Sequence, residues 1–352
     1  MIHWIVAVIF CLAIIIIYVA YMNYSQIESF DEPQPQTQEL VPEVKFPFKN
    51  IRDENGKLLN IILISAPFRA EEDEKKYAEY KEQGLSFCGI SSYSEFPDKL
   101  LNPFDSRFHE ERGHDYLSMV DAWVHCFRQP SASMASGKPL LMMSEADLKD
   151  CNGYYKPDPD INKEYDFIYI CLDDEGDKCE PGWQSYIRSW DMAKKCLEVM
   201  CEQFKLRGVI VGRTKCEFTD KCNGIVKVLP FLDFHEFQKE IQKCRFIFVP
   251  NVSDASPRVI TESLCYNLPA LVNYNIVGGW HNIIPGVTGE FFTNETDVSV
   301  AINRILTNYD SYRAREWYCK NRGKEISGGI FARFLEDNFP NINQRNMKYI
   351  TI

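Results

Sequence analysis

The sequence predicts an α/β protein with two Rossmann-like domains, each built on a parallel sheet, of which the N-terminal one is small. The chain has 352 residues, which is enough for two domains of ordinary size. From residue 58 onward, short apolar runs alternate with amphipathic helical patterns, which is typical of parallel sheets covered by helices. An uncharged segment and an acidic, proline-bearing segment come before these elements.

The uncharged segment runs from Trp4 to Met22 and has aromatic residues near both ends. Its length matches the roughly 20 apolar residues that a helix needs to cross a bilayer core. A cleaved signal peptide is the alternative, but that would carry a basic leading region and a small-residue cleavage site. We therefore expect residues 1–22 to anchor a single-pass membrane protein. The orientation stays open, because Lys45 is the first basic residue after the span.

Residues 23–57 combine acidic side chains with prolines at positions 33, 35 and 42. Such a segment buries little apolar surface, so we expect an extended polar stem. The net charge of −11, with no lysine- or arginine-rich block, argues against a nucleic-acid partner.

The 13 cysteines are scattered without C-x2-C pairs. This spacing indicates neither a zinc site nor a disulfide framework. We expect mostly buried free thiols, with a Cys216–Cys222 bridge as the alternative.

The first domain is expected over residues 58–160, on the acceptor side of the molecule. Apolar runs predict its strands, and amphipathic spacing with capping residues predicts its helices. In chain order we expect a strand over 58–64, a helix over 71–83 ended by Gly84, a strand over 85–90, a helix over 115–128 and a strand over 140–143.

The second domain is expected over residues 161–325, and its most informative stretch is 246–273. Apolar runs at 246–249 and 270–272 predict two buried strands, and Ser256-Pro257 predicts the start of the helix between them. In such a βαβ unit the loop 250–256 lies at the carboxyl edge of a parallel sheet, where open α/β sheets bind ligands. Residues 326–352 are expected to form a C-terminal helix and tail that pack back across the two halves.

Asp254 lies in this loop, and Glu262 follows eight positions later inside the predicted helix. The free N–H groups at a helix N-terminus suit a phosphate. A carboxylate further along the helix can accept hydrogen bonds from sugar hydroxyls. The alternative is that Glu262 only pairs with Arg258 on a solvated helix face.

This spacing resembles the E-x7-E motif of family-4 retaining glycosyltransferases, which have the GT-B fold, with aspartate at the first position. The surrounding sequence is similar to that family as well, at Pro257-Arg258-Val259, Glu262-Ser263-Leu264, Asn267-Leu268-Pro269 and Gly286-Val-Thr-Gly289. The resemblance is strongest over residues 166–292.

The resemblance implies a role for each residue that matches the motif. Glu262 would hold the nucleotide ribose, and Asp254 would stand near the donor sugar. The backbone around Ser256, Arg258 and Val259 would face the pyrophosphate. Arg188 would clamp the diphosphate and stabilise the leaving group, with Arg213 as a second residue of the same kind; the alternative for Arg188 is a surface arginine. Asp254, Arg188 and Glu262 are thus the expected catalytic residues.

The function that follows is a membrane-anchored, retaining glycosyltransferase. It would move a sugar from a nucleotide-diphosphate sugar to a glycan, lipid or protein acceptor, without a metal or other cofactor. One alternative is a catalytically silent sugar- or nucleotide-binding membrane protein. Another is a metal-dependent GT-A enzyme that uses Asp173 and Asp174. The acidic pair Asp158-Pro-Asp160 is interpreted as an interdomain turn.

Overall fold

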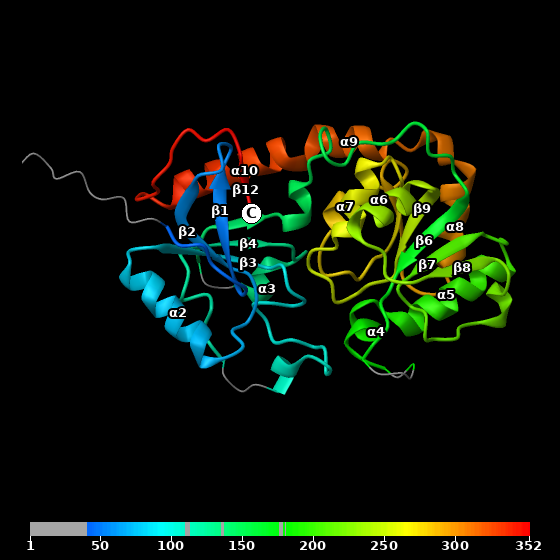
Figure 1. Cartoon of the computed structure of the whole chain (residues 1–352), viewed down its shortest axis with the longest axis horizontal. Coiled ribbons are helices and arrows are strands. Elements are labelled where there is room, and N and C mark those ends of the chain that lie inside the picture. The colour runs from blue at the N-terminus through cyan, green and yellow to red at the C-terminus, as the bar shows by residue number, and fades with distance from the viewer. Residues whose placement is uncertain (1–40, 110–112, 135–136, 176–178, 180) are drawn as a thin grey trace, which may run out of the picture. The chain divides into compact units, whose positions relative to one another are not determined.

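The computed structural model describes residues 41–109, 113–134, 137–175, 179 and 181–352 (Figure 1). The predicted anchor at 4–22 and most of the predicted stem lie outside these residues. Among the residues described, none of the helices combines the length and the apolarity that a bilayer span requires.

The first sheet has six strands in the order β12-β1-β2-β3-β4-β5. The pairs β2-β3, β3-β4 and β4-β5 are parallel, whereas β1 pairs antiparallel with both β2 and β12. The strands and helices of this part are β1 (Phe48–Asp53), β2 (Leu58–Ile64), α2 (Glu71–Glu82), β3 (Ser86–Ile90), β4 (Ala122–His125), α3 (Pro130–Ser133) and β5 (Leu140–Met142). The predicted elements at 58–64, 71–83, 85–90 and 140–143 are therefore confirmed.

β1 lies within the residues that the sequence assigned to the stem. Ile51 on this strand is fully buried and packs with Leu59 and Phe331 in the core of the first sheet. The acidic residues and prolines that precede β1 predict an extended stem, but the strand pairs with β2 and β12 and buries Ile51. The folded part of the chain thus begins before residue 58.

The predicted helix at 115–128 is wrong, because β4 occupies Ala122–His125, between β3 and β5 of the sheet. All four residues of this strand are buried, so its apolar run is continuous and its spacing fits either a strand or a helix. The contacts of Trp123 with residues on and just after β3 hold this segment in the sheet as a strand. Its indole Nε1 donates to Ser91 Oγ at 2.9 Å, and its ring lies over Gly89, where any Cβ would clash.

The second sheet has six parallel strands in the order β11-β10-β9-β6-β7-β8. Read from β8, this is the doubly wound order in which the direction of winding reverses between β6 and β9. The strands and helices are β6 (Tyr165–Ile170), α4 (Trp183–Ile187), α5 (Trp190–Glu202), β7 (Gly208–Val211), β8 (Val226–Leu229), α6 (Phe234–Gln242), β9 (Cys244–Val249), α7 (Arg258–Cys265), β10 (Ala270–Asn273), β11 (Gly289–Phe292) and α8 (Val298–Thr307).

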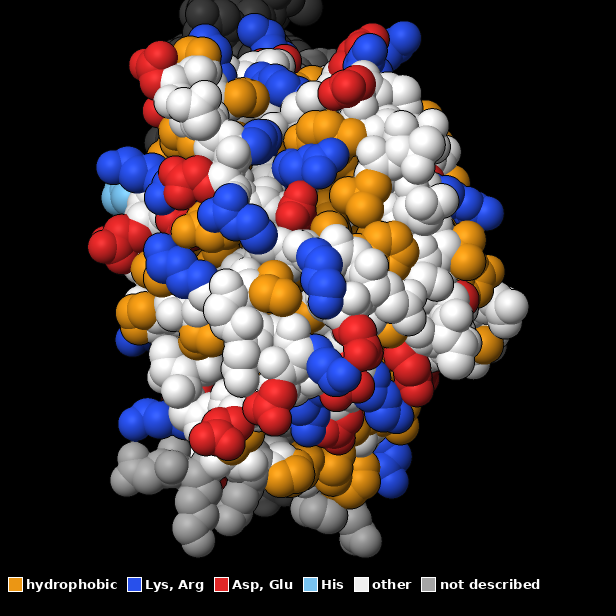
Figure 2. Space-filling model, turned by 90° about the vertical axis from the view of Figure 1, so that its right-hand side faces the viewer, with side chains coloured by type: hydrophobic (Ala, Val, Ile, Leu, Met, Phe, Trp, Pro, Cys, Tyr) orange, Lys and Arg blue, Asp and Glu red, His pale blue; other side chains and the backbone are white. Residues whose placement is uncertain are grey.

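Helices cover both faces of this second sheet. Phe167 and Tyr169 on β6 face a core that contains residues of α5 and α8, whereas Ile168 faces a core that contains residues of α7. This alternation follows from the period of two along a strand. On the face shown in Figure 2, basic and acidic side chains are interspersed.

The C-terminal segment returns to the first sheet through α9 (Ala314–Asn321), α10 (Gly323–Asn338) and β12 (Ile350–Thr351). Phe331 and Leu335 of α10 pack into the core of that sheet, and Ile350 pairs with Asp53 of β1. Figure 1 shows α10 beside β12 in the first half. The expected return of the tail is thus observed, and it includes an added strand.

Two disulfides, Cys179–Cys216 and Cys201–Cys222, are present in the second domain. The alternative Cys216–Cys222 bridge is not the one observed, since each of these cysteines is bonded to another partner. Eight other cysteines among the described residues are free, and seven of these are buried. Spacing alone did not reveal the pairs because each joins segments that are distant in the sequence.

Candidate functional site

The loop that follows β9 lies at the switch point of the second sheet, next to the carboxyl end of β6. It passes close to Gly278: a Cβ on this glycine would stand 1.8 Å from the carbonyl oxygen of Ala255. The loop therefore depends on glycine at position 278, and the turn after β10 fixes the position of Asp254.

Asp254 and Arg188 form an ion pair in which Arg188 Nη1 lies 2.7 Å from Asp254 Oδ2. Asn251 Nδ2 donates to the same carboxylate at 3.0 Å, and the backbone N–H of Ser256 donates to Oδ1 at 3.2 Å. The two side chains are 26% and 12% exposed, so the pair is reachable from solvent but partly shielded from it. The structure thus joins two predicted site residues.

Arg188 lies at the turn between α4 and α5. Its carbonyl oxygen accepts a hydrogen bond from the hydroxyl of Tyr169 at 2.9 Å. Ser189, the next residue, has a positive φ of 51°, which lets α5 begin in a new direction. This anchored turn holds the guanidinium over the switch point.

Helix α7 begins one residue later than the sequence predicted, at Arg258, with Pro257 at the N-cap. Ser256 does not cap the helix. Its hydroxyl accepts from the backbone N–H of Ala146 at 3.2 Å. Arg258 and Val259 occupy the first turn, where backbone N–H groups lack partners within the helix. The Arg258 side chain is 64% exposed and lies 3.7 Å from Glu145 Oε2.

Glu262 faces the segment that connects the two sheets. Its Oε1 lies 2.6 Å from Lys149 Nζ and 3.4 Å from the hydroxyl of Tyr155. The predicted alternative pairing with Arg258 is not the one observed. Burial and the Glu262 carboxylate together raise the pKa of Tyr155, so this tyrosine stays a hydrogen-bond donor. Sequence reasoning missed Lys149 and Tyr155, because neither lies in a motif.

Arg213 lies inside the protein, with a side chain that is 1% exposed. Its Nη1 donates to Asp174 Oδ2 at 2.9 Å and its Nη2 to Ser185 Oγ at 2.6 Å. Burial raises the pKa of Asp174, but hydrogen bonds from Ser185 and Arg213 outweigh this and lower it. The hydrogen bonds of Arg213 therefore join it to this internal network, whereas Arg188 is the arginine that pairs with Asp254.

The acidic pairs considered for a metal have partners within the protein. Asp173 accepts from the backbone N–H groups of Thr214 and Lys215 at 3.1 and 3.0 Å. Asp158 accepts from the backbone N–H of Asp160 at 3.0 Å, as expected for a turn. In the described parts of the chain, there is no cluster of three or more His, Cys, Asp or Glu side chains that could hold a metal ion.

A second buried polar contact, between Asp147 and the loop after β10, was also missed. His281 Nε2 lies 2.8 Å from Asp147 Oδ2, and Asn282 Nδ2 donates to Asp147 Oδ1 at 2.7 Å. Burial opposes the charge of Asp147, but His281 and its hydrogen bonds lower the pKa of this carboxyl overall. The capping-box pattern Ser144-x-x-Asp147 was the available signal, since the structure forms that box in the 3-10 helix Glu145–Leu148.

Lys149, Ala146 and Asp147 thus all come from one short segment after β5. Lys149 contacts Glu262 within α7, Ala146 contacts Ser256 just before α7, and Asp147 contacts His281 in the loop after β10. The Arg188–Asp254 pair lies in the loop that leads into the same helix. Such a set suits a ligand that has both phosphate groups and hydroxyls.

No protein-family profile matches the chain, and neither does any curated protein sequence. Solved structures are similar to it. The lipopolysaccharide outer core galactosyltransferase WaaB has a TM-score of 0.53 and 13% identity, over 79% of this chain and 75% of that one. Anabaena HepE in complex with UDP and glucose has a TM-score of 0.53 and 12% identity, over 78% of each chain.

TarM is a third similar structure, with a TM-score of 0.50 and 10% identity, over 79% of this chain. The chain spans about half of TarM, covering 52% of its length. At these identities the similarity concerns the fold. The chain has the two-domain α/β architecture of these structures, which is the GT-B fold.

Proposed function

We propose that this protein is a glycosyltransferase that takes a sugar from a nucleotide-diphosphate sugar. The observation that carries the proposal is the Arg188–Asp254 pair at the entrance of α7, on the switch-point edge of a GT-B fold. A partly exposed guanidinium beside a helix N-terminus is suited to a diphosphate, because both favour negative charge. The Asp254 carboxylate beside them is suited to sugar hydroxyls.

Each of these residues would bind a different part of the donor. Arg188 would exchange its bond with Asp254 for the diphosphate and stabilise the charge that develops on the leaving group. The backbone N–H groups of Arg258 and Val259 in the first turn of α7 would bind the same phosphates. Glu262 would accept hydrogen bonds from the ribose, with Lys149 and Tyr155 holding its carboxylate in place.

The donor that we propose is a uridine-diphosphate sugar. Two of the similar structures, both of HepE, hold UDP with glucose or UDP-glucose. The resemblance to family-4 enzymes favours retention of the anomeric configuration and a reaction that needs no metal. The acceptor, a glycan, lipid or protein, would enter from the side of the first sheet, and residues 4–22 would anchor the enzyme in a membrane.

The proposal is tested by measuring nucleotide release from a panel of sugar nucleotides, with the wild type and the variant Glu262→Gln side by side. We expect release from one uridine-diphosphate sugar and a loss of about 10- to 100-fold in kcat/KM in the variant, from one weakened charged hydrogen-bond set. NMR of the product anomer tests retention. Equal turnover by the variant, or activity that a chelator abolishes, would overturn the assignment.

A second candidate function is a silent sugar- or nucleotide-binding protein. Lys149 already pairs with Glu262, and Arg188 already pairs with Asp254. The two carboxylates that would bind the donor therefore already have cationic partners within the protein. Calorimetry separates the two functions. Binding of a sugar nucleotide without nucleotide release, across a panel of acceptors, would favour the silent form.

A further inference from the structure

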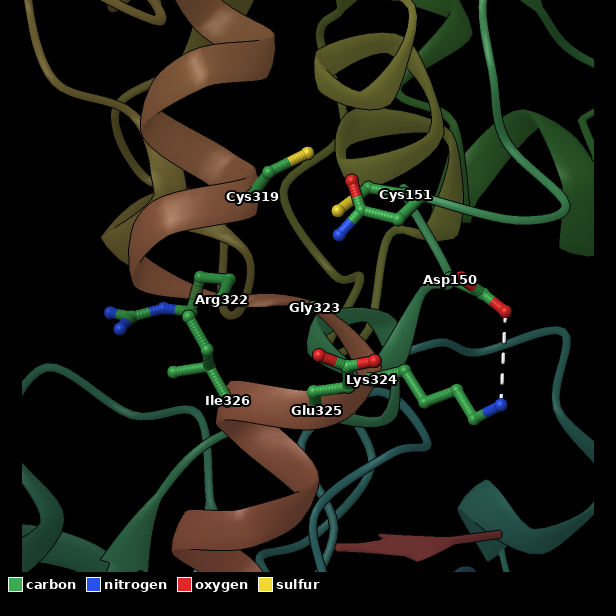
Figure 3. Close-up of a pocket in the computed structure, with 9 residues that line it drawn as sticks. Asp150, Cys151, Cys319, Arg322, Gly323, Lys324, Glu325 and Ile326 are labelled. Atoms are coloured by element: carbon green, nitrogen blue, oxygen red, sulfur yellow. Dashed lines mark ion pairs between the residues drawn. The ribbon is translucent and has the colours of Figure 1, made fainter.

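Two free thiols, those of Cys151 and Cys319, line one small cavity at the junction of α9 and α10. The cavity has a volume of about 60 Å³, and Asn152, Arg322 and Gly323 also line it. Figure 3 shows the two sulfur atoms turned toward the same space, one from the segment that connects the two sheets and one from α9. The two cysteines are far apart in the sequence.

Contacts on three sides hold Cys151 at this junction. The backbone N–H of Lys324 donates to the carbonyl of Lys149 at 3.0 Å, and Arg315 Nη2 donates to the carbonyl of Cys151 at 2.6 Å. A Cβ on Gly323 would stand 3.4 Å from Cys151 Sγ, so the sulfur lies directly against this glycine. Gly323 has a φ of +88°, a backbone conformation in which a residue with a side chain would be strained.

Cys319 reaches the same place from the last turn of α9, four residues before Gly323. Burial is the main cause that raises the pKa of the Cys151 thiol, to about 12, and the Cys319 thiol adds to the rise. The geometric evidence that the two thiols are near each other is the one small cavity that both of them line. Neither thiol is joined to another cysteine in this structure.

The surroundings favour Cys319 as the thiol that reacts first. Cys319 is partly exposed, whereas Cys151 is 4% exposed. Arg322, Lys324 and Glu325 also line the cavity, and Lys324 Nζ lies 3.7 Å from Asp150 Oδ2. The same chain already carries two disulfides, so its folded state is compatible with oxidising conditions.

We propose that Cys151 and Cys319 form a reversible third disulfide by exchange with a low-molecular-weight disulfide such as oxidised glutathione. The Cys319 thiolate attacks one glutathione sulfur, which breaks the S–S bond and releases one glutathione thiolate. The Cys151 thiolate then attacks Cys319 Sγ and releases the second glutathione. The two cysteines lose two protons and two electrons, and glutathione disulfide is reduced to two glutathione thiols.

The new bond would join the connecting segment covalently to α9. This segment, residues 149–155, carries Lys149 and Tyr155, both of which contact Glu262. Oxidation would therefore fix the segment next to Glu262, and reduction would release it.

The test uses the full chain in its folded state. The protein is incubated with oxidised glutathione, denatured, treated with N-ethylmaleimide and digested without reduction for peptide mapping. We expect a cross-linked peptide pair that contains Cys151 and Cys319, two hydrogen atoms lighter than the separate peptides, and the loss of two maleimide labels. Excess reduced glutathione should restore both labels.

Two variants serve as controls. Cys319→Ser should abolish the cross-linked pair and leave Cys151 fully labelled. Cys265→Ala should leave the pair unchanged, because Cys265 is a third thiol that packs in the same core as Cys151 and Cys319 but takes no part in the proposed bond. Full labelling of both cysteines after oxidation, a glutathione adduct on Cys319 as the only product, or a bridge to Cys265 would each overturn the proposal. The peptide map of the wild type decides the matter even if a variant fails to fold.

Discussion

Lys149 and Glu262 form an ion pair across 113 residues of sequence, with Lys149 Nζ 2.6 Å from Glu262 Oε1. The side chains are 15% and 9% exposed, so each charge depends on the other for most of its solvation. The pair connects the segment after the first sheet to α7 of the second domain. Its consequences for stability and for donor binding are separable.

Removing one partner of this pair should destabilise the protein more than removing both. Glu262→Ala leaves the Lys149 ammonium buried without its carboxylate, and we expect a loss of about 3 kcal/mol in the free energy of unfolding. The double variant Lys149→Met, Glu262→Leu should recover most of that loss. Urea denaturation of the wild type, both single variants and the double variant measures the coupling. Additive losses would show that the pair contributes little.

Arg188 should matter for turnover more than an arginine in a comparable ion pair elsewhere. Arg188→Ala is expected to lower kcat/KM for the donor by about 100-fold or more, because a charge that stabilises the leaving group is lost. Arg188→Lys should be intermediate, since an ammonium lacks the bidentate geometry. Steady-state kinetics of nucleotide release measures both.

Arg245→Ala is the matched control for this prediction. Arg245 Nη1 lies 3.1 Å from Asp166 Oδ1, and the two side chains are 32% and 21% exposed, close to the values for Arg188 and Asp254. A similar loss of kcat/KM in this variant would mean that Arg188 acts through the fold alone.

Asp147 should make the protein sensitive to acid. Burial works against its charge, but His281 and its hydrogen bonds hold its folded pKa below the ordinary value of 3.8. The unfolded chain therefore binds this proton more readily than the folded one. The stability that Asp147 confers is fully present above the ordinary value and is lost as the pH falls through the lowered pKa.

Asp147→Asn should thus be less stable than the wild type at neutral pH. Between pH 5 and pH 3, roughly one unit on each side of the ordinary aspartate pKa, the variant should lose less stability than the wild type does. Urea midpoints across that range, compared with the wild type, measure the difference. Asp105, Asp173, Asp174 and Asp297 also have lowered pKa values, but they titrate in both proteins and cancel in the comparison. Parallel curves would contradict the assignment.

The point of truncation should decide whether the N-terminal half folds. A chain that begins at Glu43 keeps β1 and should unfold cooperatively with an unchanged midpoint. A chain that begins at Leu58 lacks β1, which lies between β2 and β12 and buries Ile51 and Phe48. We expect that shorter chain to aggregate or to lose native near-ultraviolet circular dichroism. Equal thermal midpoints for the two chains would show that β1 is dispensable.

The second domain was predictable because its signals are local. The strands β9 and β10 and the helix α7 follow from apolar runs that capping and breaking residues separate, and Asp254 and Glu262 follow from their place in that unit. The switch point between β6 and β9 then adds Arg188 to the same edge.

The remainder depends on contacts that no local pattern carries. Residues 117–127 have apolar side chains at helical spacing, yet β4 lies there because both of its faces are buried. Val124 packs in a core that contains residues of α10, and Trp123 packs in a second core that contains Tyr80 of α2. Lys149 lies in no sequence motif, and it gains Glu262 as a partner only because its segment lies against α7 in the folded chain. The disulfide partners likewise lie 37 and 21 positions apart, and no local pattern pairs them.

The pairing of β12 with β1 has a consequence for synthesis on the ribosome. Ile350 and Thr351 complete a sheet whose other strands all lie at least 200 residues earlier in the chain and emerge first. Phe331 and Leu335 of α10, which cover the core of that sheet, also come late. The first sheet therefore stays partly uncovered until α10 and β12 have emerged, whereas every described strand of the second sheet has already emerged by residue 292.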